Sequence, residues 1–157
     1  MAYVSLDSDQ IKKAHKKHKY TKEQVEQLEK CMHEKTGPLF FMKTFMKIQH
    51  PTKGEMPFSP YPYQERLIEA YNNHRFSISM LPRQTGKTTC ASGYLIWYAM
   101  FKPDSQILIA AHKYAGASDI MSRVRYAYEM LPSWIKAGVT QYNRNSIEFD
   151  NGSKIMA

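Results

Sequence analysis

One stretch, from Phe76 to Phe101, constrains the fold of this chain more than any other. It begins with FSISML, in which bulky residues alternate with serines, and this period of two predicts a β-strand over residues 76–81. The loop PRQTG follows, and the almost wholly apolar segment from Lys87 to Phe101 predicts a helix that is buried on most sides. A strand, a tight loop and a buried helix in this order are typical of an α/β domain.

The loop carries Gly86-Lys87-Thr88, the end of a phosphate-binding motif. Backbone N–H groups at a helix N-terminus, a lysine and a hydroxyl are the groups that bind a nucleoside triphosphate with Mg²⁺. We expect Lys87 at the β- and γ-phosphates, Thr88 as the Mg²⁺ ligand and the N–H groups of residues 85–89 around the phosphates. The motif departs from the full pattern because Leu81 stands where its first glycine belongs.

Two features near the loop each have two interpretations. Arg83 lies four residues before Lys87, where a guanidinium could stabilise charge on a γ-phosphate. The alternative is an arginine that tunes the electrostatics of the loop or pairs with a carboxylate. Tyr63-Gln64 lies upstream, at the expected start of a helix, where the amide could bond an adenine edge while the ring stacks. The alternative is an ordinary polar residue at a helix N-terminus.

The rest of the chain predicts further helices and short strands. Thr21 and Gln24 form a capping box, which predicts a helix N-terminus. The expected elements are helices over 22–34, 38–49 and 63–73, a hairpin or extended connection over 50–57 with its turn near 53–54, a strand over 106–111, a helix over 115–131, and short strands over 139–142, 146–149 and from 154. The order strand, helix, strand, helix after residue 76 favours a parallel sheet.

The net charge of +8 favours a polyanionic partner, nucleic acid before membrane. Residues 1 to about 20 are expected to form a mobile arm, and much of the excess charge lies there, on Lys12, Lys13, Lys16, Lys17 and Lys19. Such a run could bind phosphates or an acidic partner, or it could be a solvated positive flank, which is the simpler interpretation.

Other functional classes have little support in the sequence. There is no run of about 18 apolar residues, which a membrane-spanning helix would need, and the N-terminus lacks the apolar core of a secretory signal. The two cysteines, Cys31 and Cys90, are far apart and form no metal-binding pattern, so we expect two reduced thiols. An ATPase with this loop also needs a strand that ends in an acidic residue, and neither His112 nor Asp150 is expected to supply that function.

Four segments together resemble the large terminase subunit of tailed bacteriophages, of the contractile-tailed type. They are PYPYQ, PRQTGKTT, ILIAAHK and SIEFDNGSKI, and the resemblance covers residues 38–157 in the family's order. The Arg-Gln-x-Gly-Lys-Thr form of the loop tolerates the missing first glycine and is more specific than Gly-Lys-Thr alone. The resemblance implies a P-loop NTPase-type parallel sheet flanked by helices, incomplete, with an N-terminal helical segment and a C-terminal β-hairpin region.

The resemblance also implies a motor ATPase in the host cytoplasm that uses ATP and Mg²⁺ to package double-stranded DNA into the procapsid. Its implied partners are the DNA, the portal protein, the small terminase subunit and the rest of the large subunit, with no membrane. Arg83 and Lys87 would be catalytic, with Arg83 as a finger supplied in cis and Thr88 as the metal ligand. The implied nucleotide-binding residues are Tyr63, Gln64, Gln84, Thr85, Gly86, Lys87, Thr88 and Thr89.

Family members continue with an acidic strand, a coupling motif and a nuclease domain, none of which is expected within residues 1–157. We expect a basic arm and helix over 1–35 and the front part of a P-loop ATPase domain over 36–157. Alone, these residues should hydrolyse ATP poorly or not at all and should have no nuclease activity. Two other classes stay open: a helicase-like DNA-dependent ATPase, and a non-enzymatic module whose basic arm binds DNA or a partner.

Overall fold

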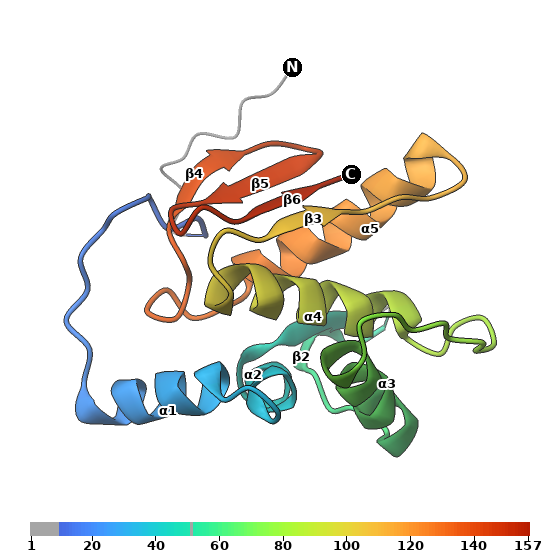
Figure 1. Ribbon diagram of the computed structural model, residues 1–157, viewed down its shortest axis with the longest axis horizontal. Helices are drawn as coiled ribbons and strands as arrows, with labels where there is room; N and C mark the ends of the chain where they lie inside the picture. The colour runs from blue at the N-terminus through green and yellow to red at the C-terminus, as the bar shows by residue number, and fades with distance from the viewer. Residues whose placement is uncertain (1–9, 51) are drawn as a thin grey trace.

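The computed structural model describes residues 10–50 and 52–157, and in this part of the chain helices flank a small sheet. In chain order the elements are α1 (Lys22–Met32), α2 (Gly37–Phe45), β1 (Lys47–His50), β2 (Gly54–Pro57), α3 (Pro62–Asn73), α4 (Lys87–Phe101), β3 (Gln106–Leu108), α5 (Tyr114–Glu129), β4 (Val139–Tyr142), β5 (Ser146–Phe149) and β6 (Lys154–Met156). Helix α4 crosses the middle of the molecule, with α5 and the sheet on one side and α1, α2 and α3 on the other (Figure 1).

The larger sheet has four strands in the order β3-β6-β5-β4. Strands β3 and β6 run parallel, with Ile107 opposite Ile155, whereas β6 with β5 and β5 with β4 run antiparallel. The α/β class is therefore confirmed, but the sheet is mixed. Among the described strands, β3 and β6 form the one parallel pair, beside an isolated parallel bridge between Lys13 and Val139, so the structure does not show the expected P-loop NTPase-type parallel sheet.

The strand predicted over residues 76–81 is wrong. This segment has no strand assignment, and its alternating side chains Phe76, Ile78 and Met80 are 81%, 95% and 93% exposed. A β-strand forms only where a neighbouring strand satisfies its backbone N–H and C=O groups. No strand in the described part of the chain pairs with this segment, so its period of two has no sheet to join.

A second correction concerns the helix predicted over residues 38–49. Helix α2 ends at Phe45, and residues 47–50 instead form β1, which pairs antiparallel with β2. The hairpin turn at Lys53-Gly54 is confirmed, since Gly54 lies opposite His50 and has a φ of 71°. The other predicted helices and strands are confirmed, with small shifts at their ends and with β3 reduced to three residues.

The core is built around α4, which is buried as predicted. Trp97 is fully buried, and its indole N–H donates to the carbonyl of Cys31 at 2.8 Å, which ties α4 to the end of α1. Gly37 lets the start of α2 lie against the end of α1, because a Cβ at residue 37 would lie 2.2 Å from the Cys31 carbonyl oxygen. Cys31 and Cys90 are free thiols, and burial raises the pKa of Cys31 to about 12 and that of Cys90 to about 11.

The N-terminal segment expected to be a mobile arm is partly fixed against the rest of the chain, at residues 11 and 12. Residues 1–9 lie outside the described residues, but Ile11 is buried in the core. The backbone of Lys12 accepts a hydrogen bond from Val139 N–H at 2.9 Å, at the edge of the sheet. None of the helices in the described part of the chain is both long and apolar enough to cross a membrane.

Candidate functional site

The loop that precedes α4 is shaped by two residues with left-handed backbone conformations. Gly86 caps the helix at a φ of 76°, and Gln84 has a φ of 62°. Glycine adopts such a conformation at little cost, whereas for glutamine it costs about 1–3 kcal/mol. Gly86 is also required for space, since a Cβ there would lie 2.5 Å from Nε2 of Gln64. The sequence therefore produces a tight, strained turn directly before a long helix.

The side chain of Lys87 turns back into this loop. Its Nζ donates to the carbonyl oxygens of Leu81 at 2.8 Å and Pro82 at 2.6 Å. The hydroxyl of Thr85 donates to the Pro82 carbonyl as well, at 3.0 Å. The first N–H groups of α4 have no partner within the helix, so they and the ammonium form a region of positive potential at the helix N-terminus. Thr88 is half-buried in the first turn of the same helix.

Two side chains from the start of α3 hold the loop in place. The Tyr63 hydroxyl and Gln64 Nε2 both donate to the Thr85 carbonyl, at 3.1 and 3.0 Å. Gln64 Oε1 also accepts from Tyr61 N–H at 3.0 Å, and the side chain is only 7% exposed. The structure therefore brings the predicted pair to the loop. One donor and one acceptor position of the amide remain after these bonds, and the adenine contact stays a prediction.

The sequence interpretation missed a second aromatic ring at this site. Tyr61 is exposed and stacks on Tyr63, with 5.8 Å between ring centroids and 6° between ring planes. The stacked pair presents a flat aromatic surface beside the residue that holds the loop. The spacing of tyrosines on either side of a proline in PYPY was the signal that could have shown it.

The charged residues considered above lie in different places. Arg83 is exposed on the loop, and among the described residues no carboxylate pairs with it. Asp150 belongs to the turn between β5 and β6, where its Oδ2 accepts from His15 N–H at 3.0 Å. Asp150 thus holds the N-terminal segment, and the carboxylate-pairing interpretation of Arg83 has no support in the described structure.

A family model described as terminase large subunit, T4-like virus type, N-terminal, matches residues 78–157. The matched range is just over half of the chain and includes the loop, α4, α5 and the whole four-stranded sheet. The chain belongs to this family. It is the family of phage DNA-packaging terminases, so the resemblance in the sequence is confirmed. Tyr63 and Gln64 lie before the matched range.

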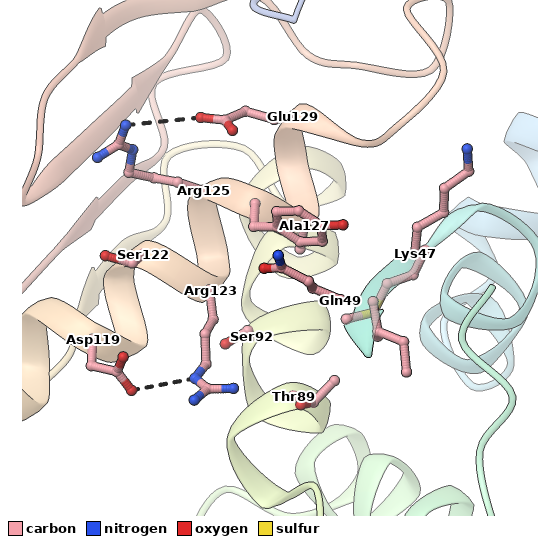
Figure 2. Close-up of a pocket in the computed structure, with 13 residues that line it drawn as sticks. Lys47, Gln49, Thr89, Ser92, Asp119, Ser122, Arg123, Arg125, Ala127 and Glu129 are labelled. Atoms are coloured by element: carbon pink, nitrogen blue, oxygen red, sulfur yellow. Dashed lines mark hydrogen bonds and ion pairs between the residues drawn. The ribbon is translucent and has the colours of Figure 1, made fainter. Parts of the chain in front are cut away.

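This terminase chain also has a pocket of about 490 Å³ between β1, α4 and α5 (Figure 2). It is lined by Met46, Lys47, Ile48, Gln49, Thr89, Ser92, Asp119, Ser122, Arg123, Arg125, Tyr126, Ala127 and Glu129. The loop and the pocket share α4 but are separate features, because Thr89 is the one residue of 82–89 in this lining.

The charges around this pocket of the terminase chain are largely compensated. Arg123 pairs with Asp119 at 3.3 Å, and the side chains are drawn facing one another across the first turns of α5 (Figure 2). Lys47 pairs with Glu55 at 2.5 Å. Ser92 lies on the α4 side and is 1% exposed, and its hydroxyl has no hydrogen-bond partner among the described residues. A lining of paired charges is less suited to a triphosphate than the Lys87 loop, where the ammonium donates to two carbonyls and pairs with no carboxylate among the described residues.

Proposed function

We propose that this chain contains the nucleotide-binding part of a packaging terminase ATPase, and that the loop at residues 82–89 binds ATP with Mg²⁺. The observation that carries the proposal is the position of Lys87. It follows a left-handed Gly86 at the N-terminus of a 15-residue helix, and its ammonium lies in the loop itself. Membership of the terminase family supports the same function.

The residues present fit a magnesium nucleotide. The unpaired N–H groups of the first turn of α4 suit phosphate oxygens, and the Lys87 ammonium can exchange its carbonyl partners for the β- and γ-phosphates. Thr88 supplies a hydroxyl oxygen, a ligand type that Mg²⁺ accepts. When bound, Mg²⁺ would offset the negative charge of the phosphates, and the protein residues would orient them.

The surrounding residues suit the other parts of the nucleotide. The stacked Tyr61–Tyr63 pair offers a ring face to adenine, and Gln64 retains one donor and one acceptor for the base edge. Arg83 is exposed and lies one residue before strained Gln84, so it is available for the γ-phosphate as a finger in cis.

The wider role follows the family. We propose that the chain works in the host cytoplasm with double-stranded DNA, the portal protein, the small terminase subunit and the remaining parts of the large subunit. The basic charge of +8 fits a DNA partner. Binding to portal protein would separate this role from that of a helicase-like translocase, which would bind DNA and nucleotide without it.

The direct test is nucleotide binding by the purified chain and by Lys87→Ala. A fluorescent ATP analogue titrated with Mg²⁺ should bind the wild type, and the variant should bind at least about tenfold more weakly, because a charge-assisted hydrogen bond contributes about 1.5–3 kcal/mol. Lys53→Ala is the matched control, since Lys53 is exposed in the β1–β2 turn. Equal binding by all three proteins, or no binding by the wild type, would contradict the proposal and favour a non-enzymatic module.

A further inference from the structure

The basic segment near the N-terminus is held at its start by the sheet. Lys12 accepts from Val139 N–H at 2.9 Å, and its own Nζ donates to the Lys136 carbonyl at 2.8 Å. His15 N–H donates to Asp150 Oδ2 at 3.0 Å, and buried Ile11 anchors the segment in the core. The segment that looked like a free arm in the sequence is therefore an edge addition to the sheet up to His15.

The same segment is held at its other end by α1. Thr21 is the N-cap, and its backbone N–H donates to Gln24 Oε1 at 3.0 Å, while Gln24 N–H donates to Thr21 Oγ1 at 3.3 Å. Residues 16–20, which we call the lysine strap, bridge these two anchors. The strap runs along one edge of the molecule from the sheet to α1, apart from the other elements (Figure 1).

The strap carries uncompensated positive charge. Lys16, Lys17 and Lys19 are exposed, and none of them pairs with a carboxylate among the described residues. Residues 10–22 contain six lysines and no aspartate or glutamate. Because both ends of the strap are fixed, its lysines are displayed at a defined place, and less chain entropy is lost when they bind than for a free tail.

The geometry points to the lysine strap as a contact for the phosphate backbone of double-stranded DNA, independent of nucleotide binding at the loop. An acidic protein partner would need apolar or arginine anchors, which provide most of the energy of protein interfaces. The strap offers three lysines, His18 and the exposed Tyr20, whose ring packs edge-on against His18. Lysines of this kind act as point charges that neutralise phosphates regardless of base sequence.

The test is the salt dependence of DNA binding by the full 157-residue chain. Binding to a fluorescently labelled duplex of mixed sequence is measured by anisotropy between about 50 and 200 mM salt, where the slope of log K against log salt counts neutralised phosphates at about 0.9 each. The triple variant Lys16→Gln, Lys17→Gln, Lys19→Gln should lose about 3 units of slope.

A matched variant removes the same charge elsewhere. Lys35→Gln, Lys53→Gln, Lys113→Gln also removes three exposed lysines, and its slope should stay within about 1 unit of the wild type. Equal losses of slope in the two triple variants, or no loss in the strap variant, would overturn the proposal.

Two further measurements separate this proposal from its alternatives. Strap-dependent binding of poly-glutamate without binding of duplex DNA would overturn it in favour of an acidic protein partner. Lys87→Ala should bind DNA with an unchanged slope, so failure of nucleotide binding leaves this proposal standing, and a slope lost with Lys87 would contradict its independence from the loop.

Discussion

Two segments of this chain share one sequence pattern and have opposite environments. Residues 76–81 and strand β5 both alternate bulky and polar side chains, yet Ile78 is 95% exposed whereas Ile147 is fully buried. β5 lies between β4 and β6 in the sheet, and its Phe149 packs against Tyr128 of α5 with 5.8 Å between ring centroids. The 76–81 segment has no neighbouring strand in the described structure.

The difference shows that alternation specifies a face but not a partner. The β5 pattern is realised because a short turn at 150–153 brings β6 beside it, as a hairpin does. A strand at 76–81 would need a partner strand that lies far from it in the sequence. None of the strands in the described residues pairs with this segment. The segment therefore has no strand structure, and at its end the Leu81 carbonyl accepts a hydrogen bond from Lys87 Nζ at 2.8 Å.

The largest expected effect lies in the sheet. Ile147→Ala should lower the free energy of unfolding by about 2–5 kcal/mol, because it opens a cavity in a fully buried site. Chemical denaturation monitored by circular dichroism measures this loss. Ile147→Val is the graded control, with an expected loss of about 0.5–1.5 kcal/mol. If both variants keep the wild-type free energy of unfolding, burial of Ile147 in the sheet does not stabilise the fold.

Lys136, which lies between α5 and β4, should make the free energy of unfolding depend on pH. Its Nζ donates to the Gln10 carbonyl at 2.7 Å and the Glu129 carbonyl at 2.8 Å, and burial lowers its pKa to about 8 from 10.5. Between these values the unfolded chain binds more protons than the folded one, so stability rises with pH. Relative to Lys136→Met, wild-type stability should rise by up to about 3 kcal/mol from pH 7.5 to 10.5.

Denaturant unfolding of the wild type and of Lys136→Met at each pH gives the difference between their free energies of unfolding. The titration of groups that both proteins share cancels in this difference. Lys53→Met, at an exposed site, should show no such trend relative to the wild type. A constant difference between wild type and Lys136→Met across the range would mean that Lys136 titrates normally in the folded state.

The loop should respond locally to the loss of Gln64. Gln64→Ala removes the bonds to the Thr85 carbonyl and to Tyr61 N–H, so stability should fall by about 1 kcal/mol while the amides of residues 84–86 exchange faster. Hydrogen exchange followed by mass spectrometry measures both effects. Gln49→Ala is the control, since Gln49 is exposed on β1. Unchanged exchange in the loop would show that Gln64 does not hold it.

The smallest expected effect is in residues 76–81, the segment without a partner strand among the described residues. Ile78→Ala should change stability by less than about 0.5 kcal/mol, because the side chain has almost no contacts to lose. The measurement is the same denaturation experiment used for Ile147→Ala, with the identical substitution. A loss above about 2 kcal/mol would break the comparison, because it would mean that residues 76–81 are paired and buried in solution.

Local signals in the sequence determined most of the elements and the centre of the candidate site. The capping box at Thr21, the turn at Gly54 and the apolar run of α4 each act within a few residues, so they could be predicted without the fold. The same is true of Gly86 and Lys87, since a glycine cap and a lysine at a helix start depend on adjacent backbone. The helix predicted over residues 38–49 is longer than α2, because residues 47–50 pair with a strand that comes later in the chain.

Only the tertiary structure decided what depends on distant partners. Gln64 bonds Thr85 across 21 residues, His15 bonds Asp150 across 135, and residues 76–81 find no strand to pair with in the described chain. The physical reason is the range of the interactions. Helix caps and turns satisfy backbone groups nearby, whereas strand pairing and the anchors of the lysine strap require groups that the sequence places far apart and only folding brings together.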